Sequence, residues 1–144
     1  MIYLTELADA LKQWLTEQSL SVAATIARRR VLVEKLEALS GIQISVIPYG
    51  VNLAQTAYLT EEQTYDIRLV VQRVLSGSAP ADETEADEAA HLVEELCRLL
   101  LGLTLVGVQC TSAAATPSYD PAKAHNLNLF DASIRTTWTT FEET

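Results

Sequence analysis

The C-terminal third of the sequence constrains the fold more than any other part. Apolar and polar residues alternate from Leu103 to Thr116 and again from Leu127 to Phe141, which predicts two long strands. A polar loop bracketed by prolines, Pro117 to Asn126, joins them. Two long strands joined by a projecting loop indicate a structural framework rather than a catalytic pocket. We therefore expect a role in assembly rather than in catalysis.

The last predicted strand has one continuous inward face. Its members are Phe130, Ala132, Ile134, Thr136 and Trp138. Leu127 and Leu129 lie in the opposite phase, so we expect a bulge near Phe130 or Asp131 if both sets are buried.

Length and charge limit the classes of function. The chain has 144 residues, of which 49% are hydrophobic, so residues 1–144 are expected to form a single domain. The formal net charge of -9 disfavours tight binding to nucleic acid or to an anionic membrane. The N-terminus lacks a signal-peptide pattern, and no apolar run approaches the ~20 residues that span a bilayer. We expect a protein made in a cytoplasm or assembled there.

No metal or cofactor is expected from the sequence. Cys97 and Cys110 each lie in an apolar periodic segment, which favours buried, reduced thiols. The acidic run from Asp82 to Glu88 lacks the spacing of a calcium loop and is better explained as the solvated start of a helix. Neither His91 nor His125 has a recognisable catalytic motif around it.

Periodicity predicts helices and further strands. Amphipathic helices are expected from Leu4 to Leu15, with Thr5 as the cap, and from Glu83 to Leu101, ended by Gly102. A short helix from Leu32 to Leu39 is expected before Gly41. Strands are predicted over three further segments: Val22 to Arg30, Ile42 to Pro48, and Tyr65 to Val74. Pro48 should close the second of these or place it at a sheet edge.

These elements together predict an α+β fold. We expect a mostly antiparallel (mixed) β-sheet with two long α-helices packed on one face, plus a short helix. The segment from Tyr49 to Glu62 is expected to be a loop or an irregular extended arm. The other sheet face would carry Arg68 and Gln72, and a partner could cover it.

The arrangement resembles the tail terminator proteins of long-tailed bacteriophages, a family of tail completion or neck proteins. The resembling segments are Arg28-Arg29-Arg30, Val46-Ile47-Pro48, Tyr65 to Val71, Leu92 to Leu96, Tyr119-Asp120 and Leu129 to Ile134. The resemblance implies a structural virion protein that forms a ring, of six subunits, on the end of the tail tube. The ring would stop tube polymerisation and present a surface to the head connector, and DNA would pass through it without specific binding.

Several residues are candidates for contacts between subunits or with partners. Arg28, Arg29 and Arg30 could pair with a neighbour's Asp82 to Glu95 region, contact DNA phosphates, or be ordinary solvated charges. On a strand, Arg29 points away from the side that Arg28 and Arg30 share. Arg68 belongs to the sheet face that a partner could cover. The two long loops add Tyr58, Tyr119, Asp120 and His125, although both loops could equally be plain connections.

Two alternative functions remain open at this point. Another neck component, such as a head-closure or head-tail joining protein, would share the acidity and the ring. A small enzyme or ligand-binding module would need Tyr65, Arg68, His91 and His125 to converge on a pocket.

Overall fold

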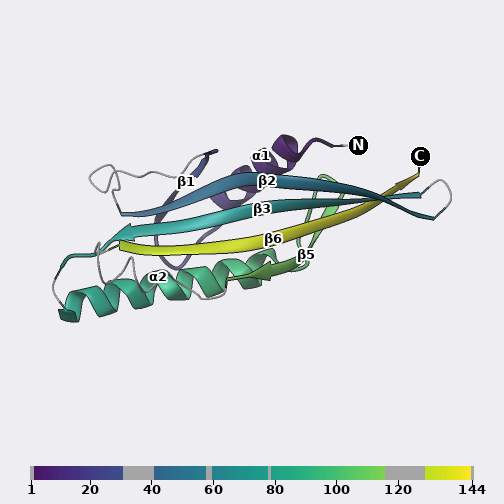
Figure 1. Ribbon diagram of the computed structural model, residues 1–144. Coiled ribbons are helices and arrows are strands. Elements are labelled where there is room, and N and C mark those ends of the chain that lie inside the picture. Colours follow the sequence, from purple (N-terminus) through teal and green to yellow (C-terminus); the bar gives the residue numbers. More distant parts are fainter. Residues whose placement is uncertain (1, 31–40, 58–59, 78, 116–128, 144) are drawn as a thin grey trace.

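The fold is dominated by one curled, mixed β-sheet. The computed structural model describes residues 2–30, 41–57, 60–77, 79–115 and 129–143 (Figure 1). About half of the structure, 51%, is sheet, which bends into a half-barrel. Its strands lie in the order β1-β2-β3-β6-β5-β4. Their bounds are β1 Ala24–Arg28, β2 Ile42–Ala57, β3 Thr60–Val74, β4 Thr104–Leu105, β5 Val108–Ala114 and β6 Leu129–Glu143.

One strand pair is parallel and the others are antiparallel. β1 runs parallel to β2, with Ala24 beside Ile42 and Arg28 beside Val46. β2, β3 and β6 form a long antiparallel ribbon, and β5 pairs with β6 on its far side. β3 and β6 stay in register from Thr60 beside Glu143 to Val74 beside Leu129.

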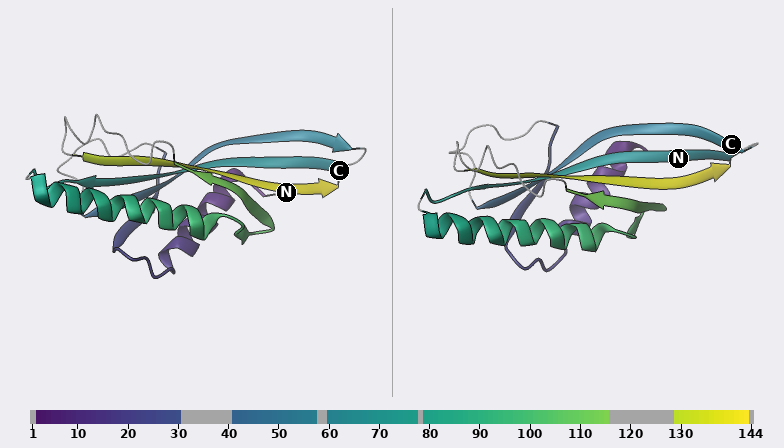
Figure 2. Two further views of the ribbon diagram at one scale, coloured as in Figure 1. Left: turned by 90° about the horizontal axis from the view of Figure 1, so that it is seen from below. Right: turned by 60° about the horizontal axis from the view of Figure 1, so that its bottom comes forward.

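Two helices of unequal length pack on the inner face of the sheet. α1 (Leu4–Thr16) lies against β1 and β2, whereas α2 (Ala79–Leu100) lies against β6, β5 and β3 (Figures 1 and 2).

At the start of α1 the backbone N–H of Tyr3 donates to a Glu6 carboxylate oxygen at 3.2 Å. The predicted cap at Thr5 is therefore misplaced. Gly102 follows α2 with a φ of 85°, a left-handed conformation that suits glycine and ends the helix as predicted.

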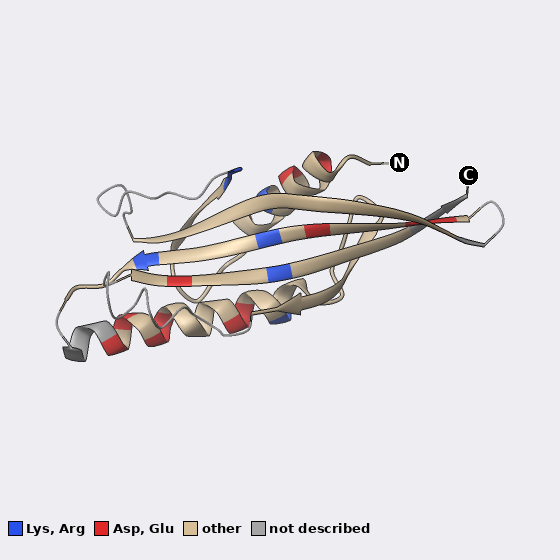
Figure 3. Ribbon diagram, viewed as in Figure 1, with Lys and Arg blue, Asp and Glu red and all other residues tan. Residues whose placement is uncertain are grey.

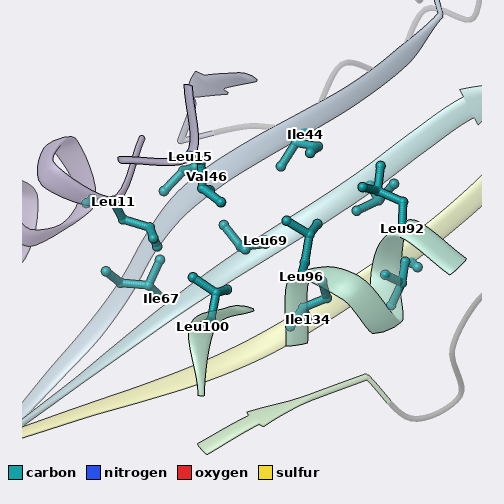
Figure 4. Packing of buried hydrophobic residues seen from close by; sticks show 14 of the residues in the cluster. Leu11, Leu15, Ile44, Val46, Ile67, Leu69, Leu92, Leu96, Leu100 and Ile134 are labelled. Atoms are coloured by element: carbon teal, nitrogen blue, oxygen red, sulfur yellow. The ribbon is translucent and has the colours of Figure 1, made fainter. Parts of the chain in front are cut away.

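A single apolar core joins both helices to the sheet. Alternate residues of β3 point into it, and leucines of the helices meet them (Figure 4). The fully buried members include Leu11, Leu15, Ile44, Val46, Tyr65, Ile67, Leu69, Leu92, Leu96, Leu100, Phe130, Ile134 and Trp138. The predicted inward face of the last strand is confirmed, because Phe130, Ala132, Ile134, Thr136 and Trp138 are all buried.

The predicted fold class is wrong. We predicted a mostly antiparallel sheet with two long helices and a short helix on one face. The structure instead has a curled, mixed half-barrel sheet that extends beyond its two helices. The error arises because residues 49–57 were expected to be a loop, whereas β2 continues through them as strand to Ala57. The short helix predicted from Leu32 to Leu39 lies outside the described residues.

The predicted bulge is also misplaced. The ladder between β3 and β6 is continuous past Phe130 and Asp131. The irregularities of the described ladders instead fall between Pro48 and Gly50 and between Gln55 and Ala57 in β2, and between Cys110 and Ser112 in β5. Pro48 does not close its strand, although it lies just past the last residue of β2 that pairs with β1.

Replacement of a buried leucine of α2 should test the core. We expect Leu96→Ala to lower the free energy of unfolding by about 2–5 kcal/mol, because it removes buried methyl groups and leaves a cavity. Leu99→Ala is the matched control, since Leu99 lies three residues on and is 38% exposed. Its effect should stay below about 1 kcal/mol in denaturant unfolding. Equal losses in the two variants would contradict this packing of α2.

Candidate functional site

The sheet projects beyond both helices as a three-stranded arm. We define the arm as residues 51–57 of β2, 60–64 of β3 and 139–143 of β6, which remain paired to the end of the sheet. Figures 1 and 2 show these strands running past α1, α2 and β5. Residues 51–55 are all exposed, as expected for a ribbon that neither α1 nor α2 covers. The arm is therefore a surface that the core of the domain does not require.

Apolar side chains lie exposed on the arm and at its base. Val51 is 53% exposed and Leu53 is 48% exposed, and both share a sheet face with their direct partners Tyr65 and Gln63. Tyr49, at the base, is 64% exposed and occupies the bulge between Pro48 and Gly50. Exposed apolar groups gathered on one projection are typical of a contact surface.

One edge of the arm has no strand beside it among the described residues. β1 pairs with β2 only as far as Val46, so from Pro48 onward the outer backbone groups of β2 have no described strand partner. An unpaired edge can accept a strand from another chain. The proline at the start of this stretch has no N–H to offer.

The face of the sheet opposite α1 and α2 carries a charged cluster, which we call the arginine face. Arg68 of β3 lies directly opposite Arg135 of β6. Asp66 bridges them, with Oδ1 3.1 Å from Arg68 Nε and Oδ2 3.3 Å from Arg135 Nε. The guanidinium of Arg68 also stacks over the ring of Tyr49, 4.1 Å from its centroid. One carboxylate serves two guanidinium groups, so the arginine face is net positive.

The three consecutive arginines do not form a common patch. Arg28 Nε lies 3.4 Å from the Asp9 carboxylate of α1, and Arg29 donates to the hydroxyl of Ser45 at 2.8 Å. Arg30 is exposed. Two of the three predicted contact residues are thus bound within their own chain. Their partners lie far away in the sequence, and no local pattern indicates these pairings.

Acidic residues follow the outside of α2 (Figure 3). Glu83, Asp87 and Glu94 are exposed on the side opposite the buried leucines, with His91 among them. On the flank of the helix, Arg73 reaches Glu88 at 3.3 Å. Within the acidic run, the predicted solvation is confirmed for Glu83, Asp87 and Glu88, whereas the Glu85 side chain is only 19% exposed.

The residues proposed for a small-molecule pocket do not converge where the structure describes them. Tyr65 points into the core, with its hydroxyl 2.9 Å from the carbonyl oxygen of Ile2, whereas Arg68 lies on the opposite face of the same strand. His91 is exposed on α2. No group of three His, Cys, Asp or Glu side chains suited to a metal ion occurs among the residues that the structure describes.

Four predicted site residues lie outside the described part of the chain. They are Tyr58, Tyr119, Asp120 and His125. The sequence analysis missed Tyr49, Asp66 and Arg135 as members of one cluster. The period-two pattern places Asp66 and Arg68 on one face, but only the strand register brings Arg135 beside them.

Comparisons with known proteins identify no family. No model of a protein family matches the chain, and none of the curated proteins matches it significantly. Within the described residues, no helix is both long enough and apolar enough to cross a membrane.

The two thiols differ in accessibility, which gives a pH prediction. Burial raises the pKa of Cys110 to about 11 from its ordinary value of 9.0, and this effect outweighs the lowering by a backbone hydrogen bond with Ser112. Burial also raises the pKa of the less buried Cys97. The folded protein keeps the Cys110 thiol protonated between about pH 9 and 11, whereas the unfolded chain ionises it. The free energy of unfolding should therefore fall as the pH rises through this window.

Denaturant unfolding at a series of pH values measures this effect. The slope of stability against pH above about pH 9 should be shallower in Cys110→Ala than in the unaltered protein, because the variant lacks the thiol. Cys97→Ala should keep more of the slope and serves as the control. Identical slopes in all three proteins would contradict the burial of Cys110.

Proposed function

We propose that the chain is a structural virion protein that forms a ring on the end of a phage tail tube. The ring ends polymerisation of the tube and offers an attachment surface for the head connector. DNA passes through the ring without specific binding. The resemblance to tail terminator proteins suggested this function, and the arm is the observation that supports it best.

The arm supports a role in assembly because its exposed residues extend the surface of the domain and do not enlarge its apolar core. Val51 and Leu53 are about half exposed, and the outer edge of β2 beside them has no described strand partner. Exposing such groups costs hydrophobic free energy and invites association, so they are most easily explained by a surface that becomes covered. A neighbouring subunit or the last tube ring would cover it.

The ring would end growth of the tube because its outer surface differs from the growing face of the tube. A subunit that binds its neighbours through two different patches forms a closed ring when the rotation between copies closes. A ring that stacks on the tube, but does not repeat the growing face of the tube, leaves no surface for the next tube subunit. The mechanism therefore needs shape and contact only, without a chemical step.

The net charge of -9 supports passage of DNA rather than capture. A mostly negative surface repels a duplex and lets it move past. The described arginines Arg28, Arg68 and Arg73 are paired with carboxylates of their own chain, which lowers their availability for phosphates.

The direct test combines solution mass with tube capping. The mass of the purified protein across concentration and salt, with negative-stain images, should show closed rings with an axial hole wide enough for a duplex. Addition of the protein to growing tail tubes should stop their elongation. If the protein neither closes into rings nor caps tubes, the proposal is refuted. Binding to the portal complex in place of the tube protein would assign it to another part of the neck.

Substitutions on the arm should separate assembly from folding. We expect Val51→Glu combined with Leu53→Glu to abolish ring formation or tube capping, because charge would replace the exposed apolar contact. Both positions are exposed, so the unfolding free energy should change by less than about 1 kcal/mol.

The matched control is Asn52→Glu combined with Ala54→Glu. These residues are also exposed on the same strand, but they point to the opposite face of the arm. Rings should persist in the control variant. Loss of rings in both variants would indicate that added negative charge, rather than the apolar contact, is responsible.

A further inference from the structure

We propose that neighbouring copies of this chain meet by docking the acidic outer stripe of α2 on the arginine face. The stripe comprises Glu83, Asp87, His91 and Glu94, and the arginine face comprises Tyr49, Asp66, Arg68 and Arg135. This inference rests on the proposed ring and names the two surfaces through which its subunits touch. Its occupant is a second copy of the same chain.

The arginine face is built at an electrostatic cost. Arg68 and Arg135 occupy directly opposite positions on β3 and β6, an arrangement that destabilises a strand pair. Asp66 offsets only part of the repulsion, because its single carboxylate lies between both Nε atoms. The side chain of Arg135 is 64% exposed, and among the described residues Asp66 is its one ion-pair partner. Its Nη groups can therefore donate to a further carboxylate.

The acidic stripe supplies carboxylates at matching intervals. Glu83, Asp87 and Glu94 are spaced by one and two helical turns, so they project from one side of α2. No described residue forms an ion pair with any of these three, whereas Glu85 and Glu88 on the flank are within ion-pair distance of Arg73. The stripe faces away from the core that Leu92 and Leu96 enter.

A hollow at one end of the stripe adds a complementary shape. It is open to solvent, has a volume of about 410 Å³, and is lined by His91 and Glu94 of the stripe together with Glu95, Arg98 and Leu99. The exposed ring of Tyr49, stacked on Arg68, is an aromatic group of the kind that fills such hollows at interfaces. A helix laid on a sheet face is also a common packing layer.

The other basic candidates fit this role less well. Arg28 already pairs with Asp9, and Arg29 already donates to Ser45. A duplex would bring phosphates to the arginine face, but the chain carries a net charge of -9 and Asp66 lies within the cluster. A second copy brings the carboxylates on a preformed helix. Because the stripe and the arginine face are different surfaces, the contact is head-to-tail and can close a ring.

Charge exchange tests the contact directly. Ring association is measured by mass and sedimentation at low and at high salt, for the unaltered protein, Arg135→Glu, the pair Asp87→Arg with Glu94→Arg, and all three changes together. We expect Arg135→Glu and the Asp87/Glu94 pair each to weaken association about tenfold or more, and the combined variant to recover most of the loss. The association should also weaken as salt rises.

Arg30→Glu is the control, since it changes the charge equally at an exposed arginine outside both surfaces. Thermal unfolding of every variant checks that the fold is retained, which the exposure of Arg135, Asp87 and Glu94 favours. Equal weakening by Arg30→Glu, or no recovery in the combined variant, would overturn the docking.

The outcomes also separate this inference from the proposed function. Rings that form unchanged in Arg135→Glu would refute the docking and leave the ring function standing. An unaltered protein that neither assembles nor caps tubes refutes the ring function, and the docking with it. Loss of binding to a duplex oligonucleotide in Arg135→Glu, with assembly unchanged, would make DNA the partner of the arginine face and overturn the docking.

Discussion

The burial of alternate residues of β3 is the interaction on which the rest of the structure depends. Tyr65, Ile67, Leu69 and Val71 enter the core from the strand that lies between β2 and β6, and both helices pack on the same core. A slip of one residue would exchange this face for Asp66 and Arg68 and bury their charges, at a cost that no packing could offset. The register is therefore fixed by the core. The same register places Asp66 and Arg68 on the opposite face of the sheet.

The two faces of the sheet consequently have different roles. The inner face is apolar and satisfies even its buried polar groups: the indole N–H of Trp138 donates to the Thr136 hydroxyl, which in turn donates to the Ile67 carbonyl. The outer face keeps charged and aromatic groups near solvent around Arg68 and Arg135. Stability is thus concentrated in the inner layer, and the arginine face and the arm are the surfaces on which the proposed contacts would form.

The sequence predicted the structure correctly where burial of one face imposes a periodic pattern of apolar residues. β3, the inward face of β6 and α2 each have one side in the core, so their patterns were readable. The prediction failed from Tyr49 to Ala57. Residues 51–55 are exposed, so burial does not select alternate residues there, and Gly50 resembled a turn signal but follows a bulge. The pairing of Arg28 with Asp9, and the meeting of Arg68 with Arg135, depend on contacts between distant segments. A single sequence carries no local signal for such contacts.

The position of β6 affects how the protein is made. This strand is the last along the chain to be synthesised among those described, yet it lies in the interior of the sheet, between β3 and β5. Until residues 129–143 leave the ribosome, β3 and β5 each present an unpaired edge, and the buried positions of Phe130, Ile134 and Trp138 are vacant. Pairing between such distant segments is slow, and open edges invite aggregation. Nascent chains are therefore exposed to premature association, and the sheet described here can close only after β6 has been translated.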